Sequence, residues 1–169
     1  LLIEALAEGA LNGAASMFAQ AASSENDAVR LAALKALGTA GDVDHIEPLF
    51  KGLEEDDEDI QSAAKAGLEI LPGDGVDLAL VNRLVESSGD VQLELIDILI
   101  TRDAVQAVGA FLEIAKNGSA DAKSAAFRGL GRLAGPDTLP QLIALALDAD
   151  EGLLSDAERA VAQVARKIE

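Results

Sequence analysis

Apolar residues recur along the chain at a fixed step of 31 residues. The stretch Asn26–Gly41 shows three of the recurring positions, which start at Val29, Ala33 and Leu37. Their later members are Ile60, Val91, Ala122 and Leu153; Ala64, Leu95, Ala126 and Ala157; and Leu68, Leu99, Leu130 and Val161. Between them Phe18, Leu49, Leu80, Phe111 and Leu142 keep the same step. Several registers with one period indicate an internal repeat of small units that bury their apolar faces by stacking on one another.

Within each unit the apolar spacing of i, i+4 and i+8 is typical of helices rather than strands. Gly, Pro, Ser, Asn and Asp separate the apolar segments and supply turns and helix caps. The pattern therefore predicts an all-α chain of helical hairpins. The expected helices are Ala14–Ala22, Ala28–Leu37, Val43–Leu53, Ile60–Leu71, Val76–Val85, Val91–Ile100, Ala104–Lys116, Ala122–Leu133, Pro136–Leu147 and a last helix that ends near Arg166.

The motif that repeats has a recognisable form. Asp27, Val29, Arg30, Ala33, Ala36, Leu37 and Gly38 give Asp-x-Val-Arg-x-x-Ala-x-x-Ala-Leu-Gly in a second helix, and Ile46, Pro48, Leu49 and Leu53 carry a first-helix pattern. In these residues the chain resembles short HEAT repeats of the phycobilisome-lyase HEAT-like type. The resemblance implies a right-handed α-solenoid of about five helical hairpins that binds partners on a concave face lined by the second helices.

We expect one solenoid domain over residues 1–169. Its repeats are a partial unit at 1–11, then 12–41, 42–73, 74–102, 103–135 and 136–169. Because Leu1–Glu8 reads as the end of a second helix without its partner, we expect a fragment of a longer protein.

Composition narrows the possible functions. Thirty acidic against thirteen basic residues give a formal charge of −17, which would repel nucleic acid or an anionic membrane surface. The chain has no Cys, so disulfides, thiolate metal sites and cysteine nucleophiles are excluded. No apolar run approaches the about 20 residues that a membrane-spanning helix needs.

Candidate chemistry is sparse. The acidic turn Glu54–Asp59 has oxygen ligands that Ca²⁺ would accept, but it also suits an exposed turn that complements the next helix N-terminus. His45 is the only histidine, and we interpret it as a solvated surface residue rather than part of a Ser-His-Asp triad. We expect no metal and no cofactor. A lyase-like or metal-dependent enzyme is disfavoured by one His, no Cys and few aromatic residues.

A binding surface is the remaining candidate. Nine of the thirteen basic residues lie on second helices, and Leu93, Ile96, Ile100 and Phe127 would form an apolar patch among them. We therefore expect a scaffold for a protein or peptide with acidic and apolar residues. Two alternatives stay open: neighbouring second helices bury these apolar side chains, or the chain is an architectural spacer beside a catalytic domain. The expected partner-binding residues are Arg30, Leu34, Lys65, Leu93, Ile96, Ile100, Lys123, Phe127, Arg128 and Arg159.

Overall fold

The computed structural model describes residues 13–168, and all regular structure in this range is helical. The predicted all-α class is therefore confirmed, while the right-handed superhelix stays a prediction. The partial repeat expected at residues 1–11 lies outside the described residues. The chain divides into two compact units, Leu1–Ala79 and Leu80–Glu169, and the boundary falls within helix α5 (Val76–Glu86).

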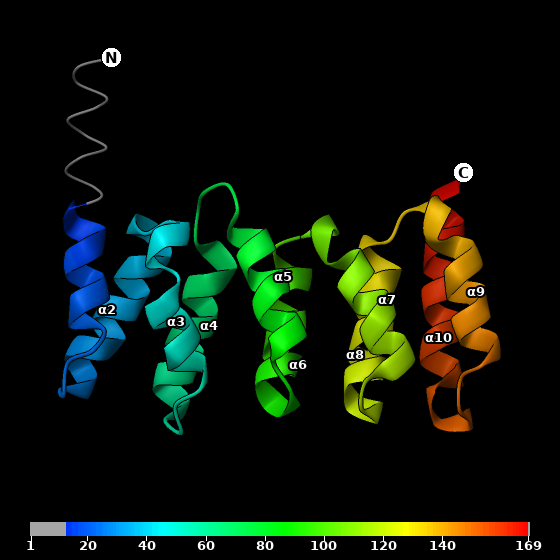
Figure 1. The fold of residues 1–169 in the computed structure, drawn as a ribbon, viewed down its shortest axis with the longest axis horizontal. Coiled ribbons are helices and arrows are strands. Elements are labelled where there is room, and N and C mark those ends of the chain that lie inside the picture. Colours follow the sequence, from blue (N-terminus) through cyan, green and yellow to red (C-terminus); the bar gives the residue numbers. More distant parts are fainter. Residues whose placement is uncertain (1–12, 169) are drawn as a thin grey trace, which may run out of the picture. The chain divides into compact units, whose positions relative to one another are not determined.

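The first unit contains helical residues 13–21, α2 (Asp27–Ala40), a 3-10 turn η1 (Val43–His45), α3 (Glu47–Leu53), α4 (Glu58–Ile70) and the start of α5. Helix α4 packs against both α2 and α3, so the hairpin α3–α4 stacks on α2 (Figure 1). Side chains cap the second helices: Asn26 accepts from the backbone N–H groups of Ala28 and Val29, and Asp57 accepts from those of Asp59 and Ile60. These caps fix where each second helix begins.

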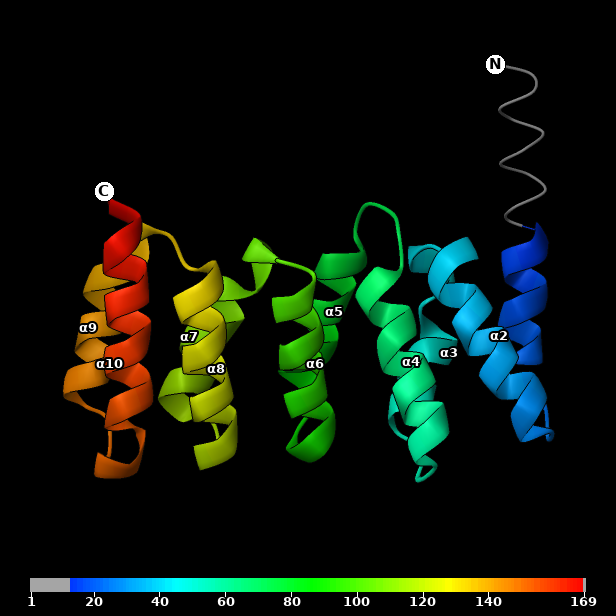
Figure 2. The same ribbon diagram turned by 180° about the vertical axis from the view of Figure 1, so that it is seen from behind.

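The second unit contains the rest of α5, α6 (Gly89–Thr101), η2 (Val105–Ala107), α7 (Val108–Asn117), α8 (Ala120–Leu133), η3 (Pro136–Thr138), α9 (Leu139–Leu147), α10 (Glu151–Ala165) and η4 (Arg166–Ile168). Helix α8 is central because it packs against α6, α7 and α10. The second helices α6, α8 and α10 form one layer, and the first helices α7 and α9 form the other (Figures 1 and 2).

The repeating registers form the core. Leu37, Leu68, Leu99 and Leu130 are completely buried, and so are Leu49, Leu80, Phe111 and Leu142 in the first helices. The Val29 register is less regular, because Val29 itself is exposed and Val91 is half-buried, whereas Ile60 and Ala122 are buried. The step of 31 residues therefore identifies most of the core positions in both units.

Proline shapes the start of two first helices. The segment predicted as one helix from Val43 to Leu53 begins instead with η1, and α3 then carries Pro48 in its first turn. Pro136 likewise opens η3 before α9. Proline is favoured in a first turn, where its missing N–H would have no helical partner.

Glycine lets second helices approach each other closely. In the first unit a Cβ on Gly38 of α2 would lie 2.7 Å from the Cα of Gly67 in α4. In the second unit a Cβ on Gly131 of α8 would clash with the side-chain amide of Gln163 and lie 3.3 Å from the Cα of Ala160, both in α10. A larger residue at either glycine would force the helices of this layer apart.

We predict opposite effects for two Gly→Ala substitutions in helices of the second unit. A Cβ on Gly129 would lie 2.5 Å and 2.7 Å from ring atoms of Phe111, a side chain with no exposed area, so Gly129→Ala should cost about 1–3 kcal/mol of unfolding free energy. Gly109 in α7 has open space around it, so Gly109→Ala should stabilise by about 0.5–1 kcal/mol. Urea unfolding followed by circular dichroism measures both, and equal shifts would contradict the tight contact.

Candidate functional site

A groove in the second-helix layer of the second unit is the main candidate site. It has a volume of about 550 Å³ and is lined by residues of α6, α8, α10 and η4. Its uncharged lining residues are Ile100, Phe127, Gly131, Ala160 and Gln163. Five of the chain's thirteen basic residues line it, and the one acidic residue in its lining is Asp156. We call it the cationic groove, and its basic residues are Arg128, Arg132, Arg159, Arg166 and Lys167.

Three of these arginines form ion pairs within the chain. Arg128 reaches Asp97 of α6 at 2.7 Å, Arg132 reaches Asp103 at 2.8 Å, and Arg159 lies 3.4 Å from Asp156 in its own helix. The three side chains stay 61%, 55% and 65% exposed. Because a guanidinium has five N–H donors, each arginine keeps donors that an incoming carboxylate can use.

The other two cations differ in their roles. Lys167 donates to the backbone carbonyls of Arg132 and Ala134 at 2.5 Å and 2.9 Å, and so caps the end of α8. Arg166 forms no ion pair with any residue between 13 and 168. Asp156, at the edge of the groove, also accepts a hydrogen bond of 2.6 Å from Ser124 of α8. Among residues 13–168, Arg166 is therefore the one basic residue of the groove whose side chain has no ionic or hydrogen-bonded partner, beside three arginines that are partly paired.

The structure brings four of the ten expected partner-binding residues together. Ile100, Phe127, Arg128 and Arg159 all line the cationic groove. Lys123 lies elsewhere in the second unit, in the lining of a second cavity between α7 and α9. Lys65 of α4 and Leu93 of α6 are half-buried and line none of the cavities described here.

The prediction of an exposed apolar patch is wrong for two of its four residues. Ile96 and Phe127 are 0% and 1% exposed, and Leu93 and Ile100 are half-buried. Leu34, expected on the same face, is only 2% exposed and lies against Gly52 of α3. The reason is that each second helix is covered on several sides: α8 by α6, α7 and α10, and α2 by α3 and α4. The alternative that neighbouring helices bury these side chains therefore holds for Leu34, Ile96 and Phe127.

Arg30 is mostly buried in the first unit and contacts groups from two turns. Its guanidinium contacts the carbonyl of Ser24 at 3.2 Å, Asp27 at 2.9 Å and Glu55 at 3.1 Å, and its side chain is 19% exposed. Together with Leu34 it lines a cleft of about 320 Å³ between the turns of two hairpins. Arg30 therefore ties the turn before α2 to the turn before α4.

Sequence reasoning left Arg132, Gln163, Arg166 and Lys167 out of the expected site. The signal for the three basic residues was present, because basic residues concentrate on the second helices. The choice of positions missed them, because it took the positions between the core registers and went no further than Arg128 in α8 and Arg159 in α10, whereas the missed residues lie in the last turns of these helices or after them.

His45 is less exposed than expected. Its side chain is 12% exposed, its Nδ1 lies 2.7 Å from Asp42, and its Nε2 lies 3.3 Å from Ser16 Oγ in helical residues 13–21. The order Ser-His-Asp is that of a hydrolase triad, but Ser16 lies on the exposed side of a helix. Nucleophilic serines of hydrolases instead lie at tight turns beside oxyanion-binding N–H groups. We interpret these contacts as a link between consecutive hairpins.

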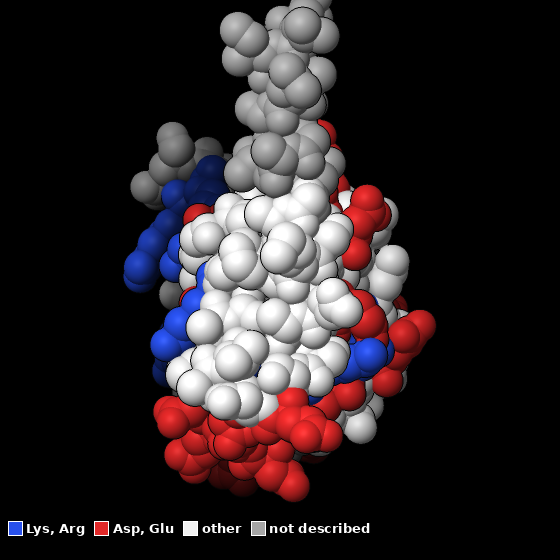
Figure 3. Space-filling view, turned by 90° about the vertical axis from the view of Figure 1, so that its left-hand side faces the viewer, with Lys and Arg blue, Asp and Glu red and all other residues white. Residues whose placement is uncertain are grey.

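Acidic residues gather at the turns. The turn Glu54–Asp59 is mostly exposed, and Figure 3 shows acidic side chains concentrated at the lower end of the view, below an uncharged face. No group of three or more His, Asp or Glu side chains in residues 13–168 is arranged to hold a metal ion. None of the helices in that same range has the length and apolar character that crossing a membrane requires.

Residues 1–69 match the family model for HEAT repeats. This match covers the first unit up to α4 and supports a HEAT-repeat family, in agreement with the hairpin packing. A search of curated proteins found no match. HEAT repeats generally serve as protein-interaction scaffolds and are typically non-catalytic.

Arg30 and Arg159 should differ in their contribution to stability. Arg30→Ala removes three contacts of a largely buried guanidinium and should cost about 1–2 kcal/mol of unfolding free energy. Arg159→Ala removes one long, exposed ion pair and should change that energy by about 0.5 kcal/mol or less. Thermal unfolding of the two variants measures the difference, and an Arg30→Ala variant as stable as the parent would contradict the structural role.

Proposed function

We propose that the chain is a non-catalytic scaffold that binds a protein or peptide segment in the cationic groove. The observation that carries this proposal is the concentration of five basic residues in one groove of a chain with a formal charge of −17. Such a local excess of positive charge attracts anionic groups despite the overall charge. The basic residues of the groove favour an acidic segment of a protein as the partner. Nucleic acid carries phosphates along its whole length and would be repelled by the acidic residues on the rest of the surface.

The groove also offers apolar contact. Ile100 is half-buried in its lining beside Gly131 and Ala160, and the side-chain amide of Gln163 lies over Gly131. A partner segment could place carboxylates against the arginines and a small or medium apolar side chain between them. Such a segment would use both the cations and the apolar lining of the groove. The partner is therefore an acidic segment that also carries apolar residues.

The second candidate is an architectural spacer or an accessory domain of a larger multidomain enzyme. The ion pairs of Arg128 and Arg132 favour it, because both reach from α8 to carboxylates on or just after α6 and so join neighbouring hairpins. An architectural spacer needs links of this kind between its hairpins, but it does not need to bind or release a partner protein. The right-handed superhelix, the single domain over 1–169 with its five repeats, and the phycobilisome-lyase type remain predictions of the same proposal.

Selection from a displayed library of random peptides tests the scaffold. We expect enriched peptides to be acidic with at least one apolar residue. Combined Arg159→Glu and Arg166→Glu substitutions should weaken their binding about tenfold or more, because like charges then face the ligand. Binding should also weaken as salt rises, since the arginines are exposed. Fluorescence anisotropy of labelled peptides measures each affinity.

The matched control is Lys35→Glu combined with Lys51→Glu, which makes the same charge change at exposed positions of the first unit. This control should bind as the parent does. Peptides that bind the parent and the groove variant equally would contradict binding in the cationic groove, and a selection that enriches no sequence class would favour the spacer.

A further inference from the structure

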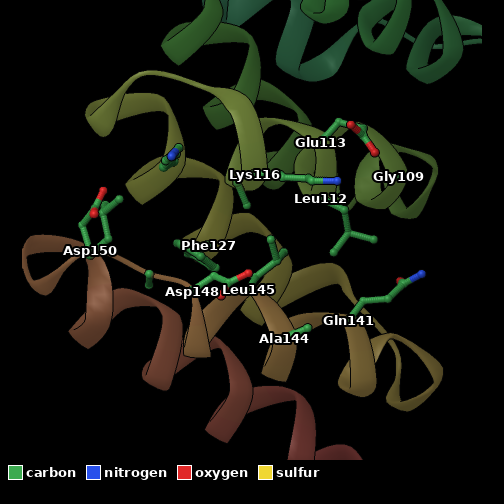
Figure 4. A pocket seen from close by; sticks show the side chains of 14 residues that line it. Gly109, Leu112, Glu113, Lys116, Phe127, Gln141, Ala144, Leu145, Asp148 and Asp150 are labelled. Carbon is green, nitrogen blue, oxygen red and sulfur yellow. The ribbon is translucent and has the colours of Figure 1, made fainter.

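A second cavity of the second unit lies outside the cationic groove. It has a volume of about 650 Å³ and lies between the hairpins α7–α8 and α9–α10 (Figure 4). Leu112, Phe127, Leu145 and Leu153 supply its apolar walls. This volume lies within the range of about 300–1,000 Å³ that is usual for ligand pockets. We call it the inter-hairpin cavity.

The cavity exists because the two helix layers pack differently. Helices α8 and α10 pack closely through Gly131, whereas α7 and α9 make far fewer contacts with each other. Small residues leave the space unfilled on both sides: Gly109 of α7 has no atoms near its Cβ position, and Ala144 of α9 is exposed. The space is therefore a result of how the hairpins stack.

Two lysines at the rim lack ionic partners. Lys116 at the end of α7 and Lys123 near the start of α8 form no ion pair with any described residue. In Figure 4 the Lys116 side chain extends along the cavity beside Leu112. Lys123 is half-buried and near the positive end of its helix, so its charge is the least compensated at the cavity.

Three acidic residues also lie at the rim, and their surroundings differ. Asp148 and Asp150 directly precede α10, whose N-terminus carries positive partial charge. Glu113 accepts a hydrogen bond of 3.3 Å from Asn117. Lys116, in the last turn of α7, is compensated by the negative end of that helix, so Lys123 is the cation at the rim that gains most from an incoming carboxylate.

The lysines are specific to this hairpin. One repeat later the equivalent positions are Leu147 and Leu154, and one repeat earlier they are Val85 and Gln92. The basic pair is therefore not part of the repeating pattern that builds the fold, and it occurs at the junction that holds the cavity.

We propose that the inter-hairpin cavity is a second peptide-binding site, which takes one large apolar side chain of a partner segment and pairs a neighbouring carboxylate with Lys116 and Lys123. The apolar side chain fills the space between α7 and α9. The carboxylate stays at the rim, where the lysines are partly solvated. This site does not depend on the cationic groove, since its basic residues are different.

Short synthetic peptides with blocked ends provide the probe. The parent peptide has a central Phe flanked by Glu in a Gly/Ser background, a second peptide replaces Phe with Ala, and a third replaces Glu with Lys. We expect only the first to shift the amide NMR signals of α7, α8 and residues 148–150. The Ala and Lys peptides should bind at least about tenfold more weakly.

Two variants alter the cavity in independent ways. Lys116→Gln with Lys123→Gln removes its free cations without adding repulsion, and Ala144→Trp fills the space from an exposed helical position. Each should weaken the Phe–Glu peptide about tenfold. Lys35→Gln with Lys51→Gln is the matched control and should leave binding unchanged.

The cationic-groove variant Arg159→Glu separates the two sites. It should leave binding of the Phe–Glu peptide at the cavity unchanged even if the groove binds nothing. Several results would overturn the cavity proposal: no signal shifts at millimolar peptide, equal binding of all three peptides, or unchanged binding to Ala144→Trp. Binding of dodecanoate at the cavity without binding of the peptide would assign it to a free amphipathic carboxylate instead.

Discussion

Close contact between second helices is the constraint on which the rest of the structure depends. Glycines permit it: Gly38 meets the backbone of Gly67 in the first unit, and Gly131 meets α10 in the second. A single added Cβ at these positions would separate the helices, and the buried leucines that repeat every 31 residues would lose their neighbours. The hydrophobic registers supply the driving force for stacking, while the glycines set the spacing at which stacking occurs.

The two helix layers of the second unit pack differently, and this difference accounts for both candidate sites. Where α8 and α10 come close, arginines on successive turns converge and make the cationic groove. Where α7 and α9 lie further apart, a cavity with apolar walls remains. The groove is lined mainly by basic residues, whereas the cavity has apolar walls and charged residues at its rim. Phe127 is buried between them and lines both.

The sequence predicts the helices and most of the core well, because burial repeats with the same step as the hairpins. It does not predict which apolar stripe of a second helix meets solvent. Ile96 and Phe127 were expected at the surface, yet they are buried, since exposure depends on how closely the neighbouring helices approach. The cavity at Lys116 was also not foreseen, because an unfilled space depends on three-dimensional packing. Of the expected partner-binding residues, Lys123 and Phe127 line this cavity.

The most direct test of this account is an NOE measurement on the labelled protein between the α protons of Gly38 and Gly67. Their backbones come so close that a Cβ on Gly38 would lie 2.7 Å from the Cα of Gly67. A strong cross-peak between these protons is therefore expected. If the α protons show no cross-peak while both helices remain folded, the second helices do not pack through their glycines, and the account is wrong.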